Sequence, residues 1–196
     1  MKKSLGCIVA LVALLIGLAV LGVGSYNNLV GLQEGVESAW GEVENHYQRR
    51  ADLVPNLVAT VRGAAEFEQE TFTRVTEARA KVGQVAVSGL PDAQQLEQFQ
   101  AAQGELSSAL SRLLVVVERY PELTATQAFR DLQVQLEGTE NRIAVARGRY
   151  NEAAQGYNTA RRRFPTVVFA GMLGFDDRPY FEAQEGAAEA PQVDFS

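Results

Sequence analysis

The sequence predicts an all-α protein in which an N-terminal transmembrane helix is followed by an up-and-down antiparallel four-helix bundle with long helices. Three observations lead to this fold class. The N-terminus is an uncharged apolar run, the apolar residues after it recur in steps of three and four, and no segment alternates apolar and polar residues as a strand does. Of the 196 residues, about 150 remain for the body, which suits one domain with one core.

Residues 5–25 are the predicted transmembrane anchor, and residues 1–4 form a short flank before it. The apolar run from Leu5 to Val23 extends about 28 Å as a helix, close to the hydrocarbon thickness of about 30 Å. A cleaved signal peptide is the alternative, because Lys2 and Lys3 precede the run. Signal peptides have apolar regions of about 7 to 15 residues, so the longer run here favours an anchor.

The charges around the anchor predict its direction. Lys2 and Lys3 lie before it, whereas the first charged residue after it is Glu34. By the positive-inside rule, the N-terminus is expected in the cytoplasm and the body on the other side of the membrane.

The first helix of the body carries one apolar stripe. Its members are Leu29, Leu32, Val36, Trp40, Val43 and Tyr47. We expect this helix to end before Pro55, because proline lacks the amide proton that a helix interior requires. Asp52 is then the N-cap of a second helix, which stops before Ser88. One continuous helix kinked at Pro55 is the alternative.

Two further helices complete the expected bundle. The third ends before Pro121, and its stripe consists of Leu96, Phe99, Gln103, Leu106, Leu110, Leu113, Val117 and Tyr120. The fourth is expected over residues 122–163 and is near 60 Å long, whereas the first is nearer 35 Å outside the membrane. Either the fourth helix overhangs the bundle, or the first two segments are one helix.

The charge is concentrated at the C-terminus. Residues 26–175 form the predicted bundle, and residues 176–196 are expected to be an acidic, disordered tail. Most of the net charge of -6 comes from this tail, which leaves the body close to neutral. A near-neutral body lacks the basic face needed to bind phosphates, so nucleic acid is excluded as a partner.

Several stretches resemble the LemA family. They are YNNLV at 26–30, QRRADLVPNLV at 48–58, EGTENRI at 137–143, and YN at both 150–151 and 157–158. The resemblance runs from the anchor to Phe175, and the tail after Arg178 lies outside it. It implies a bacterial, single-pass protein of the inner membrane with a helical bundle, no established enzymatic activity and no known ligand.

No catalytic, cofactor or metal site is predicted, and the chain is not expected to be an enzyme. A di-iron bundle needs two Glu-x-x-His motifs, but His46 is the only histidine and Val43 lies three residues before it. Cys7 is the only cysteine, so a zinc site of the usual kind also lacks ligands.

The repeated Tyr-Asn pairs at 150–151 and 157–158 lie seven residues apart and therefore share one helix face. They either fix the register of the core or form a surface that recognises a peptide or partner helix. The complete set of candidate interaction or structural residues is Arg49, Arg50, Asp52, Asn56, Glu140, Asn141, Tyr150, Asn151, Tyr157 and Asn158.

Two classes of function fit these features. The first is a non-enzymatic scaffold, held to membrane lipid by its N-terminal helix, that binds another envelope protein or copies of itself. The alternative is an envelope sensor or ligand-binding module that acts through a partner protein. The apolar segment 166–175 is too short to span a membrane, so it either lies in the membrane interface or caps the bundle.

Overall fold

The computed structural model describes residues 2–62, 69–85, 87 and 89–182, and this part of the chain is all-helical with no strand. The all-α part of the expected fold class is therefore confirmed. The helices are α1 (Lys2–Val61), α2 (Gln69–Gln84), α3 (Ala93–Val117), α4 (Pro121–Thr124), α5 (Gln127–Arg162) and α6 (Thr166–Ala170).

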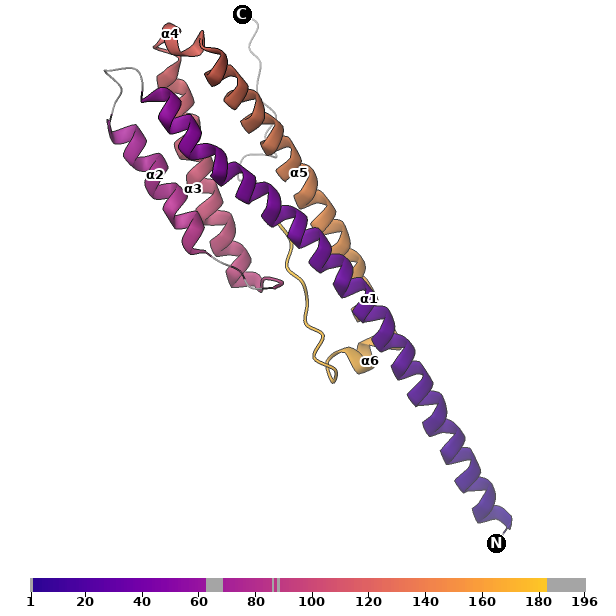
Figure 1. Cartoon of the computed structure of the whole chain (residues 1–196). Coiled ribbons are helices and arrows are strands. Elements are labelled where there is room, and N and C mark those ends of the chain that lie inside the picture. The colour runs from indigo at the N-terminus through magenta and orange to yellow at the C-terminus, as the bar shows by residue number, and fades with distance from the viewer. Residues whose placement is uncertain (1, 63–68, 86, 88, 183–196) are drawn as a thin grey trace, which may run out of the picture.

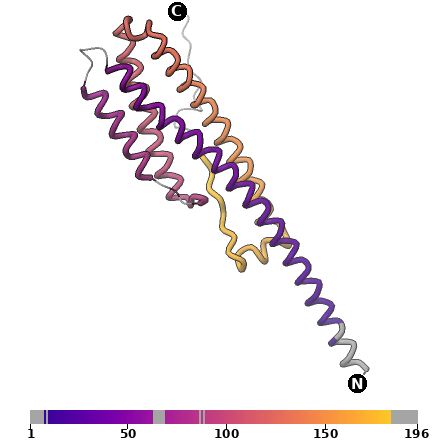
Figure 2. The backbone as a smooth tube through the Cα atoms, in the orientation of Figure 1, coloured from indigo at the N-terminus to yellow at the C-terminus, as the bar shows by residue number. Residues whose placement is uncertain are grey.

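The helices form two antiparallel pairs rather than an even bundle. α1 and α5 lie side by side over most of the length of α5, and the α2–α3 hairpin packs beside the C-terminal part of α1 (Figures 1 and 2). The regular four-helix arrangement is not confirmed, because α2 and α3 do not extend along the part of the α1–α5 pair nearer the N-terminus of α1 (Figure 1).

The core divides in the same way. One cluster joins α1 and α5 to the start of α3, where Trp40 and Tyr47 meet the ring of Phe99 edge-on. The other joins the end of α1 to the α2–α3 hairpin and the start of α5, around Val61, Leu106 and Leu113. Each cluster needs α1, so this helix connects the two pairs.

The expectation that the first helix ends before Pro55 is wrong, because α1 continues through Pro55 to Val61. Asp52 is consequently not an N-cap, and it accepts a hydrogen bond from the Gln48 amide inside the helix. The apolar stripe in the sequence already indicated that the helix continues past Pro55. Its positions continue across the proline in steps of four and three, and all are buried: Tyr47, Ala51, Val54, Val58 and Val61.

The carbonyl group that Pro55 leaves without a partner is satisfied from another helix. In an unbroken helix the amide of residue 55 would donate to the carbonyl of Ala51. Proline has no such donor, and Arg79 of α2 donates its Nε proton to the Ala51 oxygen instead, at 3.0 Å. The side chain of α2 therefore compensates the break and also ties the hairpin to α1.

The unbroken helix removes the mismatch in length between the first and last helices. Residues 24–61 rise about 57 Å and the 36 residues of α5 rise about 54 Å, so the two match. The expected fourth helix is also corrected at its start. A separate turn, α4, precedes α5, whose N-cap Thr126 accepts from the amide of Phe129 at 3.3 Å.

The N-terminal part of α1 projects alone from the body (Figure 1). It is long and apolar enough to cross a membrane, and none of its most apolar window is covered by the rest of the protein. Its large apolar side chains, such as Leu14 and Val20, are exposed on all sides. A helix that is apolar all round requires either a protein core or lipid around it, and the described residues supply no core here.

We predict that the Arg79 contact matters only because of Pro55. Arg79→Met should lower the free energy of unfolding by about 1 kcal/mol, since a carbonyl group loses its donor. Pro55→Ala should raise it by as much as about 3 kcal/mol and restore the amide at that position. In the Pro55→Ala background, Arg79→Met should then cost close to nothing. Urea unfolding of the full chain in detergent, followed by circular dichroism, measures all four proteins; an equal cost in both backgrounds would contradict this account.

Candidate interaction site around Arg50 and the C-terminal segment

Arg50 is the most polar group in the core, with only 2% of its surface exposed. One guanidinium nitrogen donates to Glu140 Oε1 and to Ser107 Oγ, both at 2.7 Å. The other donates to the backbone oxygen of Gln103 at 3.2 Å and to its side-chain oxygen at 2.5 Å. The cation also lies 4.9 Å from the centre of the Tyr47 ring.

These contacts join three helices through one side chain. Arg50 belongs to α1, Gln103 and Ser107 to α3, and Glu140 to α5. A buried charge is tolerated only where it is paired and hydrogen-bonded, and both terminal nitrogens of Arg50 meet these conditions. Its Nε is buried without a hydrogen-bond partner among the described residues. The sequence identified Arg50 and Glu140 as candidates, and the structure brings them together.

A groove opens between α3 and α5 directly over this network. Its volume is about 1150 Å³, and Tyr47 and Arg50 of α1 lie at its base. The walls carry charges of both signs: Glu97 and Arg112 on α3, and Glu140 and Arg147 on α5. An open groove with such walls suits a polar, charged peptide or helix better than an apolar ligand.

The two asparagines of the Tyr-Asn pairs hold the C-terminal segment 175–182 against α5. Asn158 donates to the carbonyl of Arg178 at 2.8 Å and accepts from its amide at 2.9 Å. Asn151 does the same with Phe181, at 2.9 and 2.8 Å. Each side-chain amide thus replaces the partner that a neighbouring strand would give to an extended backbone.

The spacing of these contacts follows from the geometry of helix and extended chain. Seven helical residues, from 151 to 158, rise about 10.5 Å. Three extended residues, from 178 to 181, cover about 10 Å. Asparagines one heptad apart therefore meet every third residue of an extended segment that runs antiparallel to the helix.

We call the contacts of Asn151 and Asn158 with the segment 175–182 the clamp. Two arginines of α5 add contacts to the segment on either side of them. Arg161 donates to the carbonyl of Phe175 at 2.6 Å, and Arg147 donates to that of Glu182 at 2.7 Å while lying 4.8 Å from the centre of the Phe181 ring. Residues 176–182, which the sequence assigned to a disordered tail, are consequently packed on α5. The remainder of that predicted tail lies outside the described residues.

The model of the LemA family matches residues 39–195 of this sequence. The chain belongs to the LemA family. The resemblance seen in the sequence is thereby confirmed, although the match also includes the tail after Arg178, which had been placed outside it. The clamp explains how part of that tail belongs to the folded unit.

Two groups of relatives have been named. Magnetosome protein MamQ 2 of Paramagnetospirillum magneticum is 29% identical over 187 residues, which cover 86% of this chain and 68% of the relative. Magnetosome protein MamQ of Magnetospirillum gryphiswaldense is 27% identical over the same shares. Protein LemA of Metamycoplasma hominis is 23% identical over 163 residues, or 83% of this chain and 71% of the relative.

The other candidate residues of this LemA-family chain do not join one site. Arg49 and Asn56 are exposed on α1, and the backbone of Asn56 accepts from the Thr60 hydroxyl at 2.9 Å. Asn141 is exposed in a shallow hollow on the other side of α5, beside His46 and Arg149. Tyr150 and Tyr157 are fully buried, so the tyrosines of the repeated pairs belong to the core, whereas the asparagines bind the segment.

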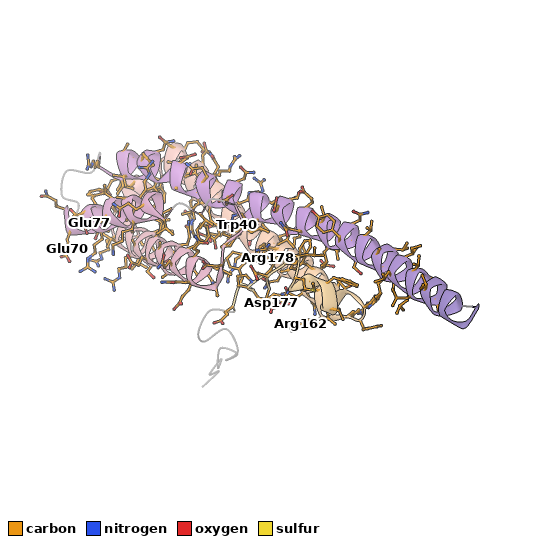
Figure 3. The ribbon with its side chains drawn as sticks, turned by 90° about the horizontal axis from the view of Figure 1, so that it is seen from below. Trp40, Glu70, Glu77, Arg162, Asp177 and Arg178 are labelled. Atoms are coloured by element: carbon orange, nitrogen blue, oxygen red, sulfur yellow. The ribbon has the colours of Figure 1, made fainter. Side chains whose placement is uncertain are left out.

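Sequence reasoning missed several residues of the LemA-family site. Gln103 was assigned to the apolar stripe of the third helix. A polar side chain at such a position indicates that a polar or charged group is buried opposite it, and this was the signal that could have pointed to Arg50. Ser107, Arg147 and Arg178 carried no such signal. Arg178 donates to Gln33 Oε1 at 3.3 Å and lies 5.5 Å from the centre of the Tyr157 ring. Arg162 and Asp177 meet at the end of α5 at 3.2 Å (Figure 3).

We predict that removing Glu140 destabilises the protein more than removing Arg50. Glu140→Ala leaves a buried guanidinium without its counter-ion and should cost about 3 kcal/mol, the lower end of the usual range because Gln103 and Ser107 still accept from it. Arg50→Met keeps the packed stem and removes the buried charge, and the remaining carboxylate is 44% exposed and can be hydrated. The double variant should be no less stable than Glu140→Ala alone. Urea unfolding of the three variants tests this order, and a larger loss for Arg50→Met would contradict it.

Tyr150 should make the protein sensitive to alkaline pH. Burial raises the pKa of its hydroxyl to about 12, although the nearby Arg178 lowers it. Between about pH 10 and pH 12 the unfolded chain loses this proton before the folded chain does, so the free energy of unfolding should fall by up to about 1.4 kcal/mol per pH unit. Tyr150→Phe should reduce this fall and leave stability at pH 8 within about 1 kcal/mol of the parent. Identical pH profiles for the two proteins would refute the assignment.

Proposed function

We propose that this protein is a single-pass, non-enzymatic scaffold of the bacterial envelope, and that it binds another envelope protein in the groove between α3 and α5. The observation that carries the proposal is the continuity of α1. One helix runs from the candidate membrane span to Val61 and contributes to both core clusters. Such a connection holds the body at a fixed height and direction relative to its anchor.

The groove supports the choice of binding surface. Its walls are two helices that have few direct contacts, and the Arg50 network lies beneath them as a rigid base. Each wall carries one acid and one base, so a partner that offers both carboxylates and cations would complement Arg112 and Arg147 as well as Glu97 and Glu140.

A structural role for the polar residues supports the non-enzymatic part of the proposal. Three of the polar side chains that sequence analysis singled out hold helices or the C-terminal segment together: Arg50 with Glu140, Asn151 with Phe181, and Asn158 with Arg178. Groups held in this way have little freedom to act as acids, bases or nucleophiles. The names of the relatives specify no reaction.

The proposed location is the inner membrane, with the N-terminus in the cytoplasm and the body outside it. The support is the exposed apolar part of α1 and the two lysines before it.

Photo-cross-linking in the native membrane tests the partner surface. A photoreactive residue replaces Gln100, in the wall of the groove, or Gln155, an exposed glutamine on α5 that does not line the groove. We expect a discrete cross-linked protein from position 100 and none from position 155. Equal products at both positions, or none at position 100, would reject the groove as the binding surface.

A further inference from the structure

Five exposed apolar residues surround α6 at the base of the body. Phe164 and Met172 are each 84% exposed, and Val167, Val168 and Leu173 are about half exposed. We call them the basal patch. A soluble protein rarely leaves such a group in water, so the patch indicates contact with another apolar phase.

The opposite side of the same segment is packed on α1 and fixes its height. The Phe169 ring lies against Gly22, where an added methyl group would be 3.5 Å from it. Thr166 lies beside Ser25, with 3.5 Å between their hydroxyl oxygens, and Phe175 meets Tyr26 with ring centres 5.6 Å apart. The segment therefore caps the end of the α1–α5 pair with one side, as one of the two alternatives expected, and exposes the other side.

The contact with Gly22 places the basal patch at the end of the candidate membrane span. The apolar run ends at Val23, so if it fills the hydrocarbon layer, Gly22 and Ser25 lie at the boundary between hydrocarbon and headgroups. α6 packs on those residues, and Figure 1 shows it beside α1 just where the projecting part begins.

Attraction between the arginines at the end of α5 and anionic lipid is a weaker basis for a contact between this end of the body and the membrane. Two of the three arginines that end α5 are paired with one acid: Arg161 at 2.9 Å and Arg162 at 3.2 Å from Asp177. An attraction that depends on these cations would be weakened by that carboxylate. The apolar side chains of the basal patch are therefore the stronger basis for contact with lipid.

We propose that the basal patch inserts into the headgroup layer of the same membrane that holds the anchor, so that the protein has a second, apolar contact with lipid. This proposal rests on the proposed function, since it takes the N-terminal part of α1 to be a membrane span. Its consequence is mechanical. A single helix is free to tilt and swivel, whereas a helix braced by a patch on one side is held at one angle and one rotation.

Quenching by spin-labelled lipid tests the second contact in the full chain. Cys7→Ser removes the native thiol, and single cysteines are then introduced for an environment-sensitive fluorophore by Met172→Cys, Leu14→Cys or Val134→Cys. These positions probe the patch, the span and an exposed apolar residue of α5 far from the base. The protein is reconstituted in phosphatidylcholine vesicles with a nitroxide placed either near the headgroup or deep in the acyl chain.

We expect the label at 172 to be quenched by the shallow nitroxide more than by the deep one, the label at 14 to be quenched strongly by the deep one, and the label at 134 to be unaffected. Quenching at 14 without quenching at 172 would overturn the second contact and leave the anchor intact. Absence of quenching at 14 would instead overturn the anchor in the proposed function.

The composition of the vesicles separates apolar insertion from charge attraction. We expect equal quenching at 172 in phosphatidylcholine and in mixtures with phosphatidylglycerol. Quenching that appears only with the anionic lipid would overturn the apolar contact, because it would assign the contact to the arginines.

Discussion

The buried guanidinium of Arg50 is the interaction on which the arrangement of the helices depends. It bonds from α1 to both α3 and α5, and α3 and α5 have few contacts with each other. A cation without solvent must be satisfied from several directions, so the positions of Gln103, Ser107 and Glu140 are constrained together.

A second constraint is that α1 must remain helical across Pro55. Because it does, the part of α1 outside the candidate span equals α5 in length, and the two pair without an overhang. Arg79 makes this possible by supplying the missing donor. The short α2–α3 hairpin then packs beside only part of the pair. The C-terminal segment packs on the part of α5 nearer the candidate span, where a regular bundle would have placed helices.

Local sequence patterns predicted what depends on local physics. The apolar stripes gave the helices, and the uncharged run gave the candidate span. Pro55 misled because propensity describes one helix in isolation, whereas the partner of the Ala51 carbonyl comes from a residue 28 positions away. The two asparagines were recognised as a repeat, but the segment that they bind was not. The sequence of α5 gives no indication that residues 178 and 181 pack against it. The pairing of Arg50 with Glu140 likewise joins residues 90 positions apart, so local patterns did not predict it.

The rigid pairing of α1 and α5 also sets the distance between the proposed groove and the membrane. From Arg147 at the lower part of the groove to Arg162 at the end of α5 the helix rises about 22 Å, and from Glu140 about 33 Å. If the basal patch holds α5 at the surface, a partner must present its charged segment at that height. A short loop between two membrane spans does not reach so far, because it would need more than six extended residues in each direction. We therefore expect the proposed partner to be a protein with a folded or extended portion of its own outside the membrane.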